Sequence, residues 1–255
     1  MSYARDRIQG TPLEGEKGQA IVHHPDVLRL LTGMRAEIEA MRALLLVGGL
    51  SLDRAHHLSG DEAEQWQTRA NLLIPVIKGW MTERSLQLTS DAVQVHGGMG
   101  FIEETGAAQH FRDARILPIY EGTTAIQAND LIFRKTLRDN GAAVRDLIGE
   151  IRSDMKDISV SGNGTAGLAA NVTGACDVAE GALDTVLARA NAPRDAAASG
   201  TDFLMMLGYL GGGWQLARAA AAAAIAKEKG EGDPAFMDAK QATANAYMAL
   251  SLIHI

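Results

Sequence analysis

Residues 117–127, of sequence LPIYEGTTAIQ, place a carboxylate where it could act as a general base. Glu121 lies between an apolar stretch and Gly122, directly before a predicted helix whose first-turn amides are free donors. A base within reach of an acidic C–H bond can take up its proton, and apolar surroundings favour that uptake. The alternative is a glutamate that caps the helix on a surface loop, and the residues alone favour this alternative.

A glycine-rich segment at 94–101, of sequence QVHGGMGF, follows a predicted helix. Its glycines could let backbone amides approach a pyrophosphate. The segment is not a P-loop, because no Gly-Lys-Ser/Thr follows, and it is not a dinucleotide fingerprint, because no predicted strand precedes it. The spacing alone therefore favours a helix C-terminus with glycines in left-handed geometry.

A third segment, YARDRIQG at residues 3–10, offers a cation. The planar guanidinium of Arg7 could bind a phosphate through two parallel hydrogen bonds. The alternative is a solvated helix end.

The elements that must position these residues are helices. Apolar residues recur at three- and four-residue spacing over 26–57 and 61–95, which predicts two long amphipathic helices that are antiparallel because their link is short. No stretch shows strand-like alternation, so the predicted fold class is all-α, a helical bundle followed by an α-helical extension. The other expected elements are a short segment at 106–115, a helix at 123–138, and alanine-rich helices at 166–191, 201–229 and 234–250.

The composition changes after Asn140, which predicts three parts. Residues 1–140 are expected to form a helical bundle domain, residues 141–165 a linker with a short helix, and residues 166–255 a helical extension domain. The run of serine and glycine that begins at 159 is typical of a flexible connection.

The overall composition is that of a soluble globular protein, with 255 residues, 47% hydrophobic and 22% charged. The formal net charge is −7, so a surface for nucleic acid or an anionic membrane is not expected. The single cysteine, Cys176, excludes an intramolecular disulfide and a cysteine-based zinc site, no other motif suggests a metal, and a cytoplasmic location is expected. The apolar stretch 203–225 contains Gln215 and Arg218, which predicts a buried helix rather than a membrane span.

Taken together and in this order, the motifs closely resemble the C-terminal part of the acyl-CoA dehydrogenase family. That family has a Tyr-Ala-x-x-Arg segment at the end of a long helix, two long antiparallel helices, Gln-x-x-Gly-Gly-x-Gly-Phe, an Arg-Asp-Ala-Arg-Ile run and Ile-Tyr-Glu-Gly-Thr. All of them are present here, and the resemblance covers residues 1–138 directly. The longer match at 94–109 and the helical extension resemble the subgroup that includes the 3-methylmercaptopropionyl-CoA dehydrogenases and their long-chain relatives.

The resemblance implies an FAD-dependent α,β-dehydrogenation of an acyl-CoA thioester, either 3-methylmercaptopropionyl-CoA or a medium- or long-chain acyl-CoA. In such an enzyme Glu121 would remove the α-proton while the β-hydride moves to the flavin. The backbone amide of Glu121 would polarise the thioester oxygen and stabilise the developing enolate charge. Tyr120 and Gly122 would line the acyl pocket.

The resemblance also assigns residues to FAD. Two motifs would contact the pyrophosphate and ADP portion across a dimer interface, and the helix after Glu121 would begin beside the cofactor. A homodimer or a dimer of dimers is implied, with electron-transfer flavoprotein as the electron acceptor and no nucleic-acid or membrane partner. The residues so assigned are Arg7, Gln9, Gln94, Gly97, Gly98, Thr123 and Ala125.

Two related classes are alternatives to a dehydrogenase. An acyl-CoA oxidase shares the base and the fold, and production of peroxide would distinguish it. An alkylation-response flavoprotein that associates with DNA would need a basic C-terminal surface, whereas the residues after 140 are net acidic.

Both ends of the sequence also carry expectations. A helix at residues 3–9 is shorter than the roughly 12–15 residues of a marginal isolated helix, and the family places two further domains before this segment. We therefore expect the chain to be part of a longer polypeptide and not to hold FAD by itself. The ending LSLIHI is the translation of a transposase mosaic end used in sequencing libraries, so residues 250–255 are expected to be adapter sequence.

Overall fold

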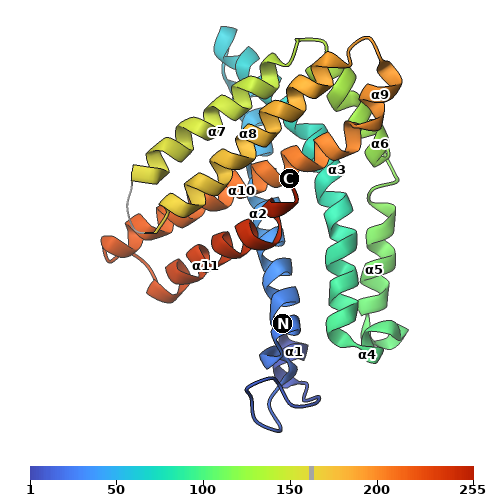
Figure 1. Ribbon diagram of the computed structural model, residues 1–255, viewed down its shortest axis with the longest axis vertical. Helices are drawn as coiled ribbons and strands as arrows, with labels where there is room; N and C mark the ends of the chain where they lie inside the picture. The colour runs from blue at the N-terminus through green and yellow to red at the C-terminus, as the bar shows by residue number, and fades with distance from the viewer. Residues whose placement is uncertain (161–163) are drawn as a thin grey trace.

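The computed structural model describes residues 1–160 and 164–255, and within these ranges it contains helices, turns and loops but no β-strand (Figure 1). An isolated backbone bridge between Ile8 and Ala20 is the only strand-like contact in the described ranges. The all-α prediction is therefore confirmed. Residues 161–163, which belong to the expected linker, lie outside the described residues.

Two long antiparallel helices form the frame of the first part of the chain (Figure 1). The short helix α1 (Ser2–Asp6) and the 3-10 turn η1 (Ile21–His23) precede α2 (Pro25–His57), which begins with a proline. Proline suits that position because its φ is already helical and the first amide has no partner within a helix. A two-residue link leads to α3 (Gly60–His96), so both long helices lie where the periodicity predicts them.

Three short elements follow α3 and return the chain along it. These are α4 (Gly98–Phe101), the 3-10 turn η2 (Glu103–Thr105) and α5 (Ala107–Ile116). Helix α5 packs against α3, so the loop after α5 emerges beside the middle of α3 (Figure 1).

The helix predicted at 123–138 has two parts. It begins as α6 (Thr124–Asn129) and continues as η3 (Asp130–Thr136), a π-helical segment with wider turns. A π-helical stretch needs neighbours that stabilise it, and α3, α10 and α7 all contact this segment.

The second part of the chain is a layer of alanine-rich helices packed on α2 and α3 (Figure 1). Within the described ranges the predicted helices at 166–191, 201–229 and 234–250 are each present to within a few residues. The elements are α7 (Ala142–Val160), α8 (Ala166–Ala188), α9 (Pro193–Ala198), α10 (Gly200–Glu228), α11 (Pro234–Leu250) and the 3-10 turn η4 (Leu252–His254).

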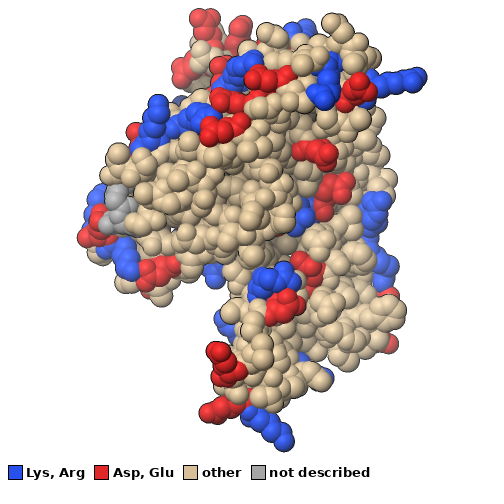
Figure 2. All heavy atoms as spheres, in the orientation of Figure 1, with Lys and Arg blue, Asp and Glu red and all other residues tan. Residues whose placement is uncertain are grey.

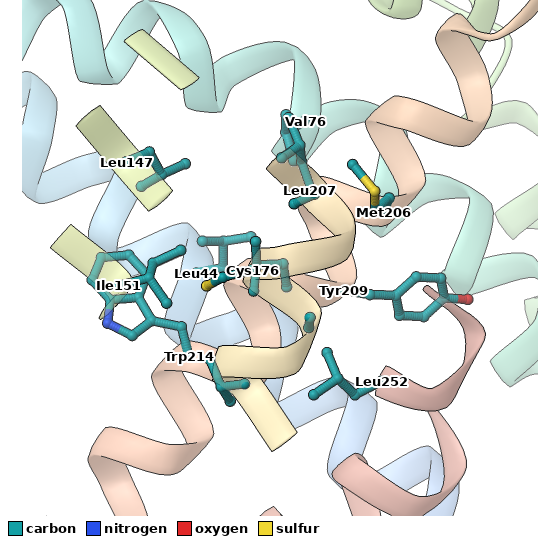
Figure 3. Packing of buried hydrophobic residues seen from close by; sticks show 14 of the residues in the cluster. Leu44, Val76, Leu147, Ile151, Cys176, Met206, Leu207, Tyr209, Trp214 and Leu252 are labelled. Atoms are coloured by element: carbon teal, nitrogen blue, oxygen red, sulfur yellow. The ribbon is translucent and has the colours of Figure 1, made fainter. Parts of the chain in front are cut away.

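One hydrophobic core joins the two parts. Figure 3 shows Leu44 of α2 and Val76 of α3 in the same cluster as Ile151, Cys176 and Trp214 from α7, α8 and α10. All five side chains are at most 1% exposed. The predicted buried helix at 203–225 is therefore confirmed, because α10 lies in the middle of this core.

Glycines let α10 approach its neighbours closely. A Cβ atom at Gly208 would lie 2.2 Å from Cγ of Trp80 on α3, and one at Gly212 would lie 2.4 Å from the hydroxyl oxygen of Tyr247 on α11. Both distances are far below van der Waals contact. The few aromatic side chains of the core thus fit because the opposing helix has no side chain at the contact.

No helix of the described residues is long and apolar enough to cross a membrane. On the face in Figure 2, acidic and basic side chains are interspersed. The C-terminal turn packs on the protein, with Leu252 at 5% exposed, and the adapter origin of residues 250–255 stays a prediction that the nucleotide sequence tests.

Candidate active site

The loop that carries Glu121 connects α5 to α6 and is closed by its own backbone. The amide of Tyr120 donates to the carbonyl of Ile116 at 3.1 Å, and the amide of Thr124 donates to the carbonyl of Pro118 at 3.1 Å. Pro118 itself is buried, whereas the residues at the tip are exposed. The loop is therefore an ordered turn that presents its tip to solvent.

Glu121 has a strained backbone. Its φ is 51°, and Gly122 follows with φ 96°. The left-handed region costs a non-glycine residue about 1–2 kcal/mol, and such strain persists only where the surroundings hold it. Two successive residues in this region reverse the chain between the loop and α6, which leaves the Glu121 side chain exposed at the tip.

Lys78 of α3 holds the loop through two hydrogen bonds, and the sequence analysis did not predict this role. Its Nζ donates to the carbonyl oxygen of Leu117 at 3.1 Å and to that of Gly122 at 2.6 Å. The same ammonium lies 5.8 Å from the ring centroid of Tyr120, within the range of a cation–π interaction. A signal existed in the sequence, because Lys78 is the only charged residue in the largely apolar run 72–81.

Thr123 and Thr124 fix the start of α6. Thr123 is the N-cap, and its Oγ1 accepts from the amide of Ile126 at 3.4 Å. The hydroxyl of Thr124, which is 6% exposed, donates to a carboxylate oxygen of Glu83 at 2.5 Å. Glu83 is also on α3, so this long helix contacts both ends of the loop. Ala125 is exposed at the first turn of α6.

The N-terminal segment forms a second group of candidate residues. The Nη2 atom of Arg7 donates to Oε1 of Gln9 at 3.0 Å, and both side chains are exposed. The backbone of this segment is anchored, since the amide of Ile21 donates to the carbonyl of Arg7 at 2.7 Å and Nε2 of His24 lies 2.8 Å from the carbonyl of Gln9.

The glycine-rich segment lies at the end of α3, beside the N-terminal segment. The hydroxyl of Tyr3 donates to the carbonyl of His96 at 3.1 Å, and the two rings stack with centroids 4.4 Å apart. Gln94, Gly97 and Gly98 are exposed, and a Cβ at either glycine would meet nothing within 4 Å. Gly97 has φ 61° and ends α3 as predicted, whereas Gly98 does not have a positive φ and instead begins α4.

The structure therefore arranges the predicted residues in two groups, not one. The Glu121 loop is tied to α3 at Lys78, whereas the second group surrounds the far end of the same helix at Gln94. Sixteen residues of α-helix span about 24 Å. The two groups of one chain cannot touch the same small group of atoms.

Clusters of metal-ligating side chains and the single cysteine are the remaining candidates for chemistry. Within residues 1–160 and 164–255, no group of three or more His, Cys, Asp or Glu side chains could hold a metal ion. Cys176 is fully buried, and this burial raises the pKa of its thiol to about 11. The thiol is therefore protonated at neutral pH.

The fold and the motifs together define a class, the C-terminal helical domain of acyl-CoA dehydrogenases. A family model described as "Acyl-CoA dehydrogenase, C-terminal domain" matches residues 3–135, and one described as "Acetyl-CoA dehydrogenase C-terminal like" matches residues 147–255. The chain belongs to the acyl-CoA dehydrogenase family.

Individual relatives agree with this assignment. The chain is 46% identical to a 3-methylmercaptopropionyl-CoA dehydrogenase of Ruegeria pomeroyi, over 99% of this chain and 43% of the relative. It is 33% identical to a broad-specificity linear acyl-CoA dehydrogenase of Mycobacterium tuberculosis, over 96% of this chain and 43% of that protein. The chain thus spans less than half the length of these curated relatives.

A solved structure has the same fold. Caenorhabditis elegans ACDH-11, in complex with C11-CoA, superimposes with a TM-score of 0.71 at 18% identity. The match covers 96% of this chain and 38% of the other. The predicted family and the predicted helical fold are both confirmed by these comparisons.

Proposed function

We propose that these residues form the C-terminal part of an enzyme that dehydrogenates an acyl-CoA thioester between its α- and β-carbons. The observation that carries the proposal is Glu121, an exposed carboxylate with φ 51° on a loop that α3 holds at both ends. The identity with two acyl-CoA dehydrogenases over nearly the whole chain supports the same reaction.

Different groups of the loop take part in proton removal and in binding of the thioester. The Glu121 carboxylate takes the α-proton, and the electrons of that C–H bond form the new α,β double bond as a hydride leaves the β-carbon. The backbone N–H of Glu121 donates to the thioester oxygen and stabilises the negative charge that develops there. Tyr120 and Gly122, which flank the base, line the acyl chain.

FAD is the proposed acceptor of the hydride, and two groups of residues would hold it. The residues fit a phosphate-bearing cofactor, because Arg7 and Gln94 are exposed near the C-terminal end of α3 and the space above Gly97 and Gly98 is open. At the other group, Thr123 and Ala125 begin α6 beside the base and would border the cofactor. Gln9 supports Arg7 through their hydrogen bond.

The separation of the two groups supports an oligomer. Because about 24 Å lies between them, each group would contact a different FAD. In a homodimer or a dimer of dimers, the Glu121 loop of one subunit and the N-terminal and glycine-rich segments of another would then meet at one FAD. Exposed apolar side chains on α2 and near the loop, such as Leu46 at 74% and Ile126 at 57%, are consistent with a surface that contacts protein. Electron-transfer flavoprotein is the proposed electron acceptor, and the proposed location is the cytoplasm.

The proposed substrate class is 3-methylmercaptopropionyl-CoA or a medium- or long-chain acyl-CoA. The Ruegeria pomeroyi relative supports the first, and the Mycobacterium tuberculosis relative, named for linear acyl-CoA, supports the second. A panel of these thioesters, offered to the full-length protein with a dye as electron acceptor, would rank them by kcat/KM.

The test of the function is Glu121→Gln in the full-length protein, with Glu104→Gln as a matched control on the exposed turn η2, at the other end of α5. General-base catalysis contributes roughly 10²–10⁴-fold, so Glu121→Gln is expected to lower kcat by about 10³-fold while the bound FAD stays at wild-type level. Glu104→Gln is expected to retain wild-type turnover. Full activity in Glu121→Gln would refute the proposed base.

A further inference from the structure

The middle of α3 directs two charged side chains at the loop that carries Glu121. Lys78 and Glu83 are half-buried and lie five residues apart, about 7.5 Å along the helix axis. Neither side chain is part of the proton transfer described above. We infer that Lys78 and Glu83 are positioning residues that hold the Glu121 backbone in its strained conformation. This inference rests on the proposed function.

Lys78 joins two carbonyl groups that are far apart along the loop. Its Nζ donates to Leu117, where the loop leaves α5, and to Gly122, the residue directly after the base. A single ammonium thus fixes the distance between the start of the loop and the residue that follows Glu121. The ring of Tyr120, directly before Glu121, lies 5.8 Å from the same ammonium. Leu117, Tyr120 and Gly122, three of the residues around Glu121, therefore all interact with the same Nζ atom of Lys78 on α3.

Glu83 fixes the end of the loop in the same way. One of its carboxylate oxygens accepts from the buried hydroxyl of Thr124 at 2.5 Å. Thr124 is the first residue of α6, so this bond orients the helix that begins directly after the loop. The two contacts of α3 bracket Glu121 on both sides.

The backbone of Glu121 explains why such bracketing is needed. A φ of 51° is unfavourable for glutamate, and without external contacts the residue would relax towards negative φ. Relaxation would rotate both the carboxylate and the backbone N–H away from a bound thioester. Displacements of about 1 Å can lower a rate by 10²-fold, so Lys78 is expected to act on the rate through the geometry of the base.

The test compares Lys78→Met, Lys78→Arg and the control Lys156→Met in the full-length FAD-bound protein. Lys156 is an exposed lysine on α7, far from the loop in sequence, and its replacement is expected to change nothing. Two measurements are made: amide hydrogen exchange of peptides that cover 117–124, and kcat together with the Kd of an unreactive thioester analogue.

For Lys78→Met we expect exchange at 117–124 to become at least about tenfold faster, with exchange in α2 and α10 unchanged. We expect kcat to fall about 10²-fold while the Kd of the analogue changes less than about twofold, because the base is misplaced rather than removed. Lys78→Arg keeps a cationic donor and is expected to recover at least tenfold of the loss in kcat.

Three results would overturn the inference. They are unchanged exchange at 117–124 in Lys78→Met, exchange that rises equally in α2 and α10, and a kcat in Lys78→Arg no better than in Lys78→Met. If Lys78→Met does not fold, Thr124→Val removes only the hydroxyl that donates to Glu83. It is expected to accelerate exchange at 117–124 about threefold, and no acceleration would equally overturn the inference. Hydrogen exchange reports on the loop even if Glu121→Gln proves active, so failure of the inference and failure of the proposed function are distinguishable.

Discussion

The region from α2 to α6 and the region from α7 to α11 differ in where their large apolar side chains lie. In the second region α10 is buried along most of its length, and side chains such as Leu183 and Trp214 are fully inaccessible. In the first region many are exposed, including Phe101 at 81% and Leu46 at 74%. The second region has a closed core that supports α2 and α3, whereas the first carries the candidate site and leaves apolar surface free.

The difference extends to the backbone. The first region contains the strained residue Glu121 and the left-handed glycines Gly97 and Gly122, at or beside the candidate site residues. The second region also has glycines of positive φ, Gly230 and Gly232, but they lie in the link between α10 and α11, and its helical glycines Gly208 and Gly212 serve close packing. At Glu121 the strain coincides with the proposed chemistry, whereas Asn140, which also has a positive φ, lies in the turn before α7 and away from the candidate site.

A partly buried ion pair of the first region should give the largest effect on the comparison, because Ser251 and Tyr209 of the second region contact it. Arg84 of α3 binds Glu37 of α2 through two hydrogen bonds of 2.7 and 2.9 Å, and the hydroxyl of Ser251 donates to the same carboxylate at 3.0 Å. Arg84→Met is expected to destabilise the protein by about 3 kcal/mol, because it leaves a buried carboxylate without its cation.

Chemical denaturation with far-UV circular dichroism measures this loss, and Arg29→Met is the control. Arg29 pairs with Asp26 on the surface, with side chains 55% and 73% exposed, so its loss should cost less than about 1 kcal/mol. Two separate unfolding transitions in the Arg84→Met protein would show that the regions are not one cooperative unit.

Close packing between the regions gives the next largest effect. Gly208→Ala would place a Cβ 2.2 Å from Cγ of the buried Trp80, so α10 must move away from α3. Overpacking of this kind costs about 1–3 kcal/mol. The matched control is Gly149→Ala on α7, where a Cβ meets nothing within 4 Å, and it is expected to stabilise the protein by up to about 1 kcal/mol. Thermal unfolding of both variants measures these changes in stability. Equal melting temperatures for Gly208→Ala and Gly149→Ala would contradict the packing argument.

The pH dependence of stability should reveal the closed core of the second region. Burial raises the pKa of Cys176 from 9.0 to about 11, so the folded state holds this proton more tightly than the unfolded state. The resulting stability is fully present below pH 9 and is lost as the pH rises towards 11. By pH 10 the loss from this thiol is about 1 kcal/mol.

Cys176→Ala isolates that contribution, because buried tyrosines act in the same direction. Burial also raises the pKa of Tyr247 well above its usual value. The stability difference between wild type and Cys176→Ala, measured by urea denaturation, should therefore be about 1 kcal/mol smaller at pH 10 than at pH 7. A difference that does not change with pH would mean that the thiol is accessible.

Apolar periodicity predicted most of the fold because most helices here are amphipathic or buried over many turns. The ends of α2, α3, α10 and α11 lie within one residue of the predicted ranges. The π-helical η3 was not predicted, because the widening of a helix depends on what packs against it and leaves no mark on the spacing.

The candidate site could likewise be predicted only in part. Glu121, Gly97 and Arg7 could be singled out because their motifs are local in sequence. Lys78 stands out as the only charged residue in the run 72–81, but its contact with Gly122 could not be predicted, because the contact arises only through the packing of α3 against a loop 44 residues further along the chain. The roles assigned to FAD and to the dimer interface stay predictions.

The central claim is that Glu121 removes the α-proton, and isotope exchange tests that step alone. Acetyl-CoA has α-protons but no β-carbon, so it permits proton transfer without hydride transfer. In deuterated buffer the full-length FAD-bound protein is expected to exchange these protons, as followed by NMR, and Glu121→Gln is expected to slow the exchange by about 10³-fold with Glu104→Gln unchanged. An equal exchange rate in Glu121→Gln and wild type would contradict the account.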